Sequence, residues 1–408
     1  MDEKSRTGFH ELAQETQLYP QESLLKVKSD KNSLFIGLPK EISLQESRIV
    51  LTPDGVGLLT ANGHEIWIET GAGKESKYTD QEYSDAGAKI VYSAEEVYKA
   101  EIILKVEPPT LEELEYIKPR KSIISAIQLG NQTPEFLKAL IDKKITALGY
   151  ELIEDKAGGT PLVRAMSEIA GCSVMLIAAE YLSSANEGKG IILGGISGVP
   201  PTKVIILGAG TVAEHAARAA LGLGVDIQVF DDHIYKLRRI KHALGHQIFT
   251  STLNAVQVME SLKQADVVIG AIRSEKGRNR CIVTDEMVSQ MKPGSVIIDV
   301  NIDQGGCIET SRMTTHSNPV YTKHDVIHYC VPNIASRVPR TATQAINNIF
   351  TPILLQAADE GGIEESIFKH NRLMKGVYAY KGHLTNADIA TKFSMEHKDI
   401  NLFIAARF

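Results

Sequence analysis

The sequence predicts an α/β protein with two Rossmann-like domains, each built on a parallel sheet. Three observations predict this fold class. Short apolar runs alternate with helical patterns from Leu34 onwards, residues 204–232 form a complete β-α-β pattern, and two long apolar helical patterns interrupt the alternation. The length of 408 residues is also enough for two domains.

The first part of the chain is a succession of strand and helix patterns, which favours a parallel sheet covered by helices on both faces. We expect strands at residues 34–38, 65–69, 102–106, 122–127 and 145–150. We expect helices between them at residues 52–62, 94–99 and 134–143.

The alternation changes near Pro161, where residues 162–185 form one long, mostly apolar helical pattern. A loop rich in Gly and Pro follows and leads to further βα units. These have strands at 204–207, 225–230, 266–271 and 295–299, and a second long helical pattern covers residues 341–361. The tail at 376–393 is expected to return to the first domain.

This organisation predicts one domain inserted into another, with the two long helices as connections. We assign residues 34–161 and 339–408 to a discontinuous substrate domain and residues 162–338 to the inserted domain. Residues 1–33 carry little periodic signal and are expected to form a tail or an arm on a neighbouring subunit.

The β-α-β pattern has the features of a dinucleotide-binding unit. Gly208 permits the tight turn after the first strand, and Gly210 lets the backbone approach a pyrophosphate at the helix N-terminus. Ala213 takes the place of the third glycine. Asp231, at the end of the second strand, is placed to bind ribose hydroxyls and disfavours a 2′-phosphate, so NAD is expected rather than NADP. The alternative is a flavodoxin-like unit with a tight turn.

Composition excludes several function classes. The net charge of −6 is mild and the basic residues are scattered, which argues against nucleic-acid binding. We find no apolar run of membrane-spanning length and no secretory pattern at the polar N-terminus. The four cysteines are far apart, so we expect reduced thiols, no metal site and a cytoplasmic protein.

Several segments together resemble one family of NAD-dependent enzymes. They read GLPKE, ESRIVLTPDGV, LKVEPP, MSEIAG, GAGTVAEHAAR, MKPGSVIIDVNIDQGGC and HYCVPNIASRVPRTAT. Across roughly residues 34–395 the chain is similar to alanine dehydrogenases and to the soluble NAD-binding part of nicotinamide nucleotide transhydrogenase. The resemblance implies conversion of L-alanine, NAD and water into pyruvate, ammonium and NADH, in a homohexamer.

The resemblance also implies which residues meet the substrate. Arg48 matches the arginine that binds the substrate carboxylate, and a guanidinium suits that task. Lys105 closes an apolar strand and matches the lysine that contacts the substrate's oxygens. Asp303 matches the aspartate that handles protons and orients substrate beside the nicotinamide. Solvated surface positions or loop capping are the alternatives for these three.

Gln128 is a departure from the family pattern. By position it replaces a histidine that acts as acid and base, and an amide does not shuttle protons near neutral pH. Either Asp303 and Lys105 carry the proton, or the reaction differs, or activity is weak. No pattern marks His316, His324 or His328 as a substitute. Arg164 is also unusual and either binds an additional acidic group or lies on the helix surface.

Further cofactor contacts are implied by the resemblance alone. They are Ser167 near the pyrophosphate or nicotinamide, Ala271 under the adenosine, and Val331, Asn333 and Ile334 close to the nicotinamide. Strand-end packing is the alternative role for each of them.

Three functions are compared on these grounds. The first is an NAD-dependent alanine dehydrogenase acting on a small amino acid and its oxo acid. The second keeps the fold but acts on another amino acid or amine, because of Gln128 and Arg164. The third is an NAD-binding or transhydrogenase-like component, which should carry an Arg-rich, Gln-containing loop that residues 151–168 lack. For either enzyme we expect the two domains to close on substrate.

Overall fold

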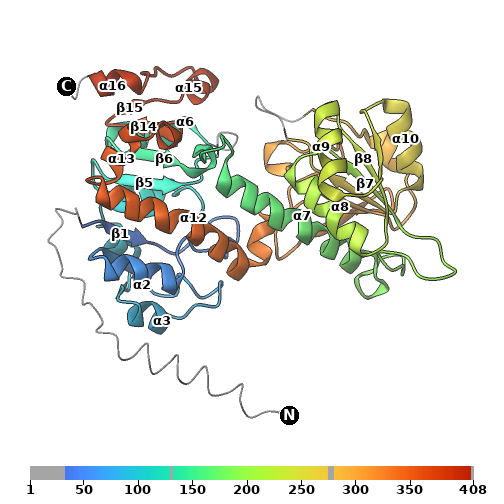
Figure 1. The fold of residues 1–408 in the computed structure, drawn as a ribbon, viewed down its shortest axis with the longest axis horizontal. Coiled ribbons are helices and arrows are strands. Elements are labelled where there is room, and N and C mark those ends of the chain that lie inside the picture. Colours follow the sequence, from blue (N-terminus) through green and yellow to red (C-terminus); the bar gives the residue numbers. More distant parts are fainter. Residues whose placement is uncertain (1–32, 129–131, 274–279, 406–408) are drawn as a thin grey trace, which may run out of the picture.

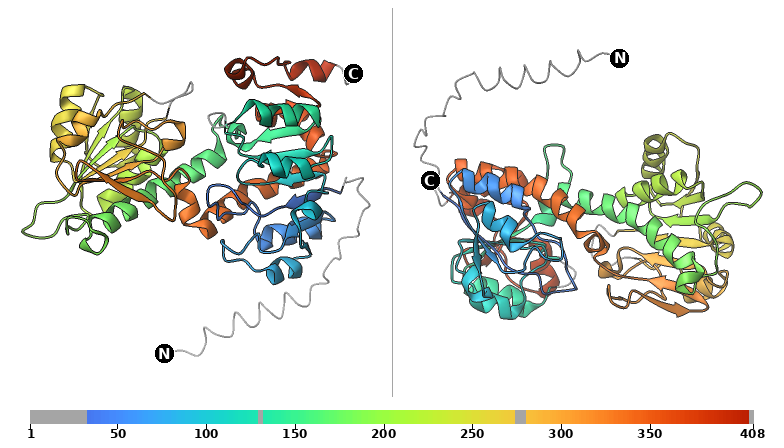
Figure 2. Two further views of the ribbon diagram at one scale, coloured as in Figure 1. Left: turned by 180° about the vertical axis from the view of Figure 1, so that it is seen from behind. Right: turned by 90° about the horizontal axis from the view of Figure 1, so that it is seen from below.

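The computed structural model describes residues 33–128, 132–273 and 280–405. These residues form two lobes, which two long helices connect (Figure 1). The first lobe contains the early strands together with the C-terminal segment, and the second contains the middle of the chain, as all three views show (Figure 2). The two-domain α/β fold class expected from the sequence is therefore confirmed.

The sheet of the first lobe has the strand order β15-β14-β6-β5-β4-β1-β2-β3. Its strands are β1 (Phe35–Leu38), β2 (Glu65–Glu69), β3 (Lys89–Val91), β4 (Ile102–Leu104), β5 (Ser122–Ser125), β6 (Thr146–Gly149), β14 (Val377–Tyr380) and β15 (His383–Leu384). β1 to β6 pair in parallel, whereas β14 is antiparallel to β6 and β15 to β14. The parallel sheet expected from residues 34–150 is thus confirmed for β1 to β6, and the two strands that the C-terminal segment adds at one edge are antiparallel.

The helices of the first lobe mostly begin at side chains that cap them. They are α2 (Pro53–Ala61), α3 (Asp80–Asp85), α4 (Ala94–Val97), α5 (Leu111–Tyr116), α6 (Pro134–Asp142), α13 (Ile363–Lys369), α14 (Asn371–Met374), α15 (Ala387–Phe393) and α16 (Asn401–Ala405). Before α2, α4, α5 and α6 the cap is a hydroxyl that accepts a hydrogen bond from the first turn, supplied by Thr52, Ser93, Thr110 and Thr133. These caps fix where each strand-to-helix loop ends.

The second lobe has the strand order β12-β13-β11-β10-β7-β8-β9. Its strands are β7 (Lys203–Leu207), β8 (Asp226–Phe230), β9 (Phe249–Ser251), β10 (Val267–Gly270), β11 (Val296–Asp299), β12 (Val320–Lys323) and β13 (Val326–Tyr329). All neighbours are parallel except the hairpin β12–β13. The helices around it are α8 (Thr211–Gly222), α9 (Ile234–Leu244), α10 (Ala255–Gln264) and α11 (Asp285–Ser289).

The long helices α7 (Pro161–Leu182) and α12 (Pro339–Asp359) connect the lobes and pack on each other (Figure 1). Contrary to the sequence expectation, α7 is long and apolar enough to cross a membrane, with a mean hydropathy of 1.6. Its packing explains that composition. Gly171 lies so close to α8 that an added Cβ would be 2.5 Å from the carbonyl oxygen of Val212. We therefore interpret α7 as a core helix of the protein.

Candidate functional site

The loop that carries Arg48 is hydrogen-bonded to the segment that leaves the second lobe. Backbone N–H groups of this loop donate to side chains of the 3₁₀ helix η5 (Ile334–Arg337) and of α12. Ser47 N donates to Ser336 Oγ over 2.8 Å and Ile49 N to Thr343 Oγ1 over 3.0 Å. Because both partners flank the inter-lobe connection, the position of Arg48 depends on both lobes.

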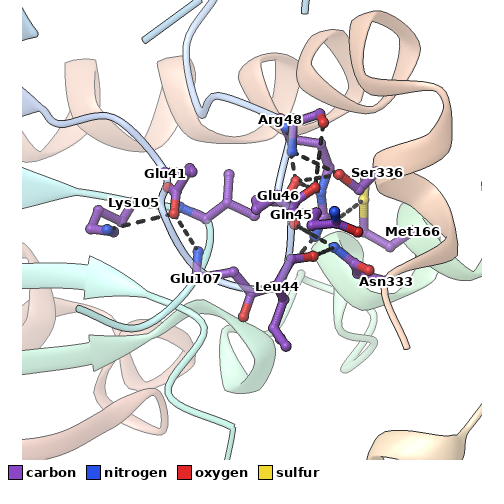
Figure 3. A network of polar contacts seen from close by, with 12 residues as sticks. Glu41, Leu44, Gln45, Glu46, Arg48, Lys105, Glu107, Met166, Asn333 and Ser336 are labelled. Carbon is purple, nitrogen blue, oxygen red and sulfur yellow. Dashed lines mark hydrogen bonds and ion pairs between the residues drawn. The ribbon is translucent and has the colours of Figure 1, made fainter. Parts of the chain in front are cut away.

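The Arg48 guanidinium is buried and oriented by Glu46 (Figure 3). Nε donates to Glu46 Oε1 over 2.7 Å, and a terminal nitrogen donates to Glu46 Oε2 over 2.5 Å. The other terminal nitrogen donates to the Met166 sulfur over 3.2 Å. A guanidinium has about five N–H donors, so among the described residues one N–H on each terminal nitrogen makes no hydrogen bond, and Glu107 Oε1 lies 3.6 Å from one of these nitrogens. Such a fork suits a carboxylate.

Lys105 lies immediately after β4 and its side chain is fully buried. Its ammonium is 2.5 Å from Glu113 Oε1 and 3.6 Å from Glu41 Oε2. Glu113 is also the capping-box residue of α5 and accepts a hydrogen bond from the Tyr98 hydroxyl. The lysine is therefore fixed by a carboxylate that is itself anchored to a helix start.

Gln128 follows β5 in the left-handed region, with φ of 51°. Its backbone N–H donates to Glu151 Oε1 over 2.8 Å, which holds the residue in that conformation. Its side-chain amide donates to Glu107 Oε2 over 2.7 Å. The other Glu107 oxygen is 3.6 Å from the Arg48 guanidinium. Gln128 and Arg48 thus meet at Glu107, a residue that was not among those predicted from the sequence.

Three buried carboxylates lie around the Arg48 guanidinium and the Lys105 ammonium, those of Glu41, Glu46 and Glu107. Burial raises the pKa of Glu41 to about 7 against the opposing charge of Lys105. Burial and the charge of Glu46 raise the pKa of Glu107 to about 8, although Arg48 opposes this. Burial also acts on Glu46, but the charge and hydrogen bonds of Arg48 outweigh it and hold the pKa of Glu46 below its ordinary value. Burial thus opposes ionisation of Glu41 and Glu107, whereas the ion pair with Arg48 favours ionisation of Glu46.

Asp303 lies in the second lobe, in the 3₁₀ helix η4 (Ile302–Gln304) after β11. It is half-buried, and burial raises its pKa. Among the described residues, no hydrogen bond or ion pair joins Asp303 to Arg48 or Lys105. The structure therefore brings Arg48, Lys105 and Gln128 into one network and leaves Asp303 on the opposite lobe.

The loop between β7 and α8 fits a dinucleotide. Gly208 has φ of 108°, and an added Cβ would lie 2.6 Å from the carbonyl oxygen of Ala271, so the turn requires glycine. Around Gly210 an added Cβ would meet nothing within 4 Å. Gly210 is the N-cap of α8 without a side-chain cap, so amide donors and open space coincide there. Ala213 is fully buried on α8.

Asp231 lies directly after β8 and is buried. One oxygen accepts from the backbone N–H of Ala209 over 2.8 Å, and the other accepts from the backbone N–H of His233 over 2.8 Å. The carboxylate therefore already fixes the glycine loop. A ribose hydroxyl has to use the remaining acceptor capacity of the same oxygens.

The other cofactor candidates lie after strands of the second lobe or on α7. Ala271 follows β10, Ser167 is half-buried on α7, and Val331, Asn333 and Ile334 follow β13 in buried positions. The Asn333 amide donates to the carbonyl of Leu44 over 3.1 Å (Figure 3). Asn333 thus connects the second lobe to the loop that carries Arg48.

The remaining candidate residues lie outside the Arg48 network. Arg164 is exposed on the first turn of α7, 3.9 Å from Asp155. His324 pairs with Asp285 at 2.8 Å, and His328 is fully buried with Thr310 at 2.7 Å. His316 precedes Ser317, which bonds to Gln45 across the lobes, and burial lowers its pKa. The cysteines of the described chain are free thiols, and its His, Cys, Asp and Glu residues form no grouping suited to a metal.

The carboxylates that organise the site were not among the functional residues predicted from the sequence. Glu46, Glu107 and Glu113 are ordinary acidic residues among 50 in the chain, and their burial is not visible in the sequence. Glu113 alone had a signal, because Thr110 and Glu113 have the spacing of a capping box.

Comparison with known proteins covers almost the whole described chain. Residues 37–170 match the family model of the alanine dehydrogenase/PNT N-terminal domain, and residues 174–387 match that of the C-terminal domain. The chain is 40% identical over 367 residues to alanine dehydrogenase 2 of Staphylococcus aureus strain Mu50. That alignment covers 90% of this chain and 98% of the relative, and strain USA300 gives the same figures.

Solved structures are similar over the same extent. A structure named L-alanine dehydrogenase has a TM-score of 0.83 and 36% identity, covering 88% of this chain and 99% of the other. The transhydrogenase from Sinorhizobium meliloti has a TM-score of 0.73 at 23% identity, covering 86% and 99% respectively, and so shares the fold.

Proposed function

The chain belongs to the alanine dehydrogenase/PNT family, and from that premise we propose that it oxidises L-alanine to pyruvate and ammonium with NAD. The observation that carries the proposal is the oriented guanidinium of Arg48, whose terminal nitrogens form a fork that Glu46 holds beside the Lys105 and Gln128 network. An amino acid and its oxo acid share the carboxylate that such a fork binds.

The residues of the first lobe hold the substrate. Arg48 binds the substrate carboxylate through its terminal nitrogens, and Glu46 keeps the guanidinium in that orientation. Lys105 supplies positive charge beneath the site, held there by Glu113. Because Arg48 and Lys105 are fixed before substrate arrives, little side-chain entropy is lost on binding. Asp303 approaches from the second lobe and orients the substrate when the lobes close.

The second lobe holds the cofactor. When bound, NAD accepts a hydride from the substrate carbon. Gly208, Gly210 and the start of α8 bind its pyrophosphate, and Asp231 faces the ribose. Ala213, Ser167, Ala271, Val331, Asn333 and Ile334 complete the binding surface. A 2′-phosphate is disfavoured by Asp231 and by Asp232, which follows it and pairs with Arg280 at 3.2 Å.

The test is NADH formation from L-alanine and NAD, together with NADH consumption by pyruvate and ammonium. Arg48→Lys provides the matched variant, because it keeps the charge but removes the fork. We expect a much higher KM for alanine in this variant with unchanged NADH affinity. Wild-type protein that binds NADH but turns over neither substrate pair contradicts the assignment.

A second candidate substrate is another amino acid, or an amine other than ammonium joined to an oxo acid. The amide of Gln128 favours it, because a side chain that donates to Glu107 changes the hydrogen bonding beside the reacting nitrogen. A panel of amino and oxo acids monitored by NADH absorbance separates the two: activity on alanine alone excludes this candidate.

We also propose a cytoplasmic homo-oligomer, in keeping with the hexamer that the family resemblance implies. Light scattering coupled to size-exclusion chromatography gives the subunit number directly, and a monomeric mass at working concentration contradicts the proposal.

A further inference from the structure

Glu107 occupies the meeting point of the side chains assigned to the substrate. One carboxylate oxygen accepts from the Gln128 amide over 2.7 Å, and the other is 3.6 Å from the Arg48 guanidinium. Its backbone N–H points to Glu41 Oε2, 3.4 Å away. Glu107 is only 3% exposed, so its carboxylate is enclosed by these groups.

The groups that face Glu107 explain why it can hold or release a proton. Glu41 and Glu46 place negative charge near it, Arg48 places positive charge, and the Tyr150 hydroxyl lies in the same field and donates to the carbonyl of Val106. Burial and Glu46 dominate, which brings the pKa of Glu107 to about 8. Both protonation states are therefore available under neutral to mildly alkaline conditions.

We propose that Glu107, positioned by Gln128, is the acid and base of the deamination assigned above. This inference rests on the proposed function and deepens it, because it names the proton carrier of the same site. A Glu107 oxygen lies 3.6 Å from the guanidinium assigned to the substrate carboxylate, so the acid and base stands beside the group that would hold the substrate.

The proton steps balance through this one carboxylate. Glu107 first takes a proton from the substrate ammonium and releases it to solvent, so that loss of hydride to bound NAD would leave a singly charged iminium. Water then adds to the iminium carbon and gives one proton to Glu107, which forms a neutral carbinolamine and a protonated Glu107. Glu107 returns that proton to nitrogen, then takes the hydroxyl proton as the carbon–nitrogen bond breaks and the oxo acid forms. Ammonia finally takes the proton from Glu107 and leaves as ammonium, so the carboxylate is regenerated.

Other groups fit this role less well. Lys105 is fully buried, with Glu113 at 2.5 Å and Glu41 at 3.6 Å, and so acts as a fixed charge. His324 and His328 bond to Asp285 and Thr310, within the second lobe. Asp303 has no bond to the Arg48 network in the part of the chain described above. Glu41 is the strongest competitor, since it is buried in the same cluster, but it faces Lys105 and the backbone of Val106.

The experiment compares Glu107→Gln with Glu41→Gln, two isosteric changes in one cluster. We expect Glu107→Gln to lower kcat for L-alanine by about 10²- to 10⁴-fold, the typical contribution of general acid–base catalysis. NADH affinity should stay within about twofold of wild type. The ionisation near pH 8 in the wild-type profile of kcat/KM should disappear in Glu107→Gln and persist in Glu41→Gln.

Two results overturn the proposal on Glu107. One is a Glu107→Gln enzyme with wild-type kcat and pH profile, and the other is loss of the ionisation in Glu41→Gln alone. If Glu107→Gln does not fold, Glu107→Asp decides: at least a tenfold lower kcat with a shifted ionisation supports the role, and unchanged values refute it. Wild-type protein without amino-acid turnover refutes the proposed function itself, so the two failures are distinguishable.

Discussion

Glu46 and Arg48 are two residues apart and form a buried, doubly hydrogen-bonded ion pair, with N–O distances of 2.7 and 2.5 Å. Ser336 donates to the same glutamate over 2.9 Å from the segment that leaves the second lobe. The orientation of the candidate substrate-binding arginine is therefore set by a local turn and by a contact that links the two lobes.

Removing one partner of this pair should destabilise the protein and impair the site together. Glu46→Gln leaves a buried guanidinium without its carboxylate, which typically costs about 3–5 kcal/mol. We expect a clearly lower thermal midpoint and a loss of about 10²-fold in kcat/KM for alanine, since a displaced binding group costs roughly that much. Calorimetry and NADH-coupled rates measure the two effects.

The double variant Glu46→Gln/Arg48→Met separates stability from function. Replacing both charges by neutral groups of similar size should restore most of the thermal midpoint, because no buried charge is left unpaired. Activity should not recover, because the guanidinium is gone. A double variant that recovers turnover would show that Arg48 does not bind the substrate.

The raised carboxylates predict that the protein loses stability as the pH rises. The folded pKa of Glu41 is about 7 and that of Glu107 about 8, both above the ordinary value of 4.5, so the folded state binds more protons than the unfolded state above pH 4.5. The contribution of these two groups to the free energy of unfolding is fully present below pH 4.5. It is lost as the pH rises towards 8, by at most about 1.4 kcal/mol per pH unit for each group. Urea titrations at several pH values across this range give the free energy of unfolding. We expect this free energy to depend less steeply on pH in Glu41→Gln than in the wild type. An unfolding free energy that increases with pH, or an unchanged slope in the variant, contradicts the assignment.

The sequence identified the elements more completely than it identified the site. Periodic apolar runs located β1, β2 and the long helices α7 and α12 within a few residues. The glycine turn also carried its own signal, since Gly208 is required by backbone geometry alone. Short elements with weak periodicity, such as α3, β3 and β9, were not anticipated.

The polar network could not be predicted from the sequence, and the reason is physical. The roles of Glu46, Glu107 and Glu113 come from burial and from contacts between segments, which a single sequence does not display. Resemblance supplied Arg48 and Lys105, whose partners the structure reveals as carboxylates. The resemblance also identified Gln128 as a departure from the family pattern, but only the structure shows that its amide donates to Glu107.

The close crossing of α7 and α8 gives a prediction about packing. Gly171→Ala would place a methyl group 2.5 Å from the Val212 carbonyl oxygen, so the helices must separate. Overpacking of this kind costs about 1–3 kcal/mol. Gly222→Ala, at the end of α8, is the matched control: its Cβ meets nothing within 4 Å, and helix propensity should stabilise it by about 0.5–1 kcal/mol. Equal midpoints for the two variants would contradict the close contact.

Closure of the lobes is expected once both ligands are present, because candidate residues lie on both sides: Arg48 on the first lobe and Asp303 on the second. Small-angle scattering should show a smaller radius of gyration with NADH and an oxo acid together than with NADH alone. The contacts between Gln45 and Ser317, at 3.0 and 3.1 Å, lie on the inter-lobe path and should change during closure. An unchanged radius with both ligands bound would mean that the lobes are already in their working arrangement.

Alanine variants of Gly208 and Gly210 distinguish an effect on folding stability from an effect on cofactor binding. Gly208→Ala introduces a side chain at φ of 108° and 2.6 Å from the Ala271 carbonyl oxygen, so it should lower the thermal midpoint as well as NADH affinity. Gly210→Ala meets no protein atom within 4 Å, so stability should be close to wild type. Its methyl group occupies the space assigned to the pyrophosphate, so NADH affinity should fall by at least about tenfold, equivalent to about 1.4 kcal/mol. Fluorescence titration with NADH and thermal unfolding measure the pair, and wild-type affinity in Gly210→Ala would place the cofactor elsewhere.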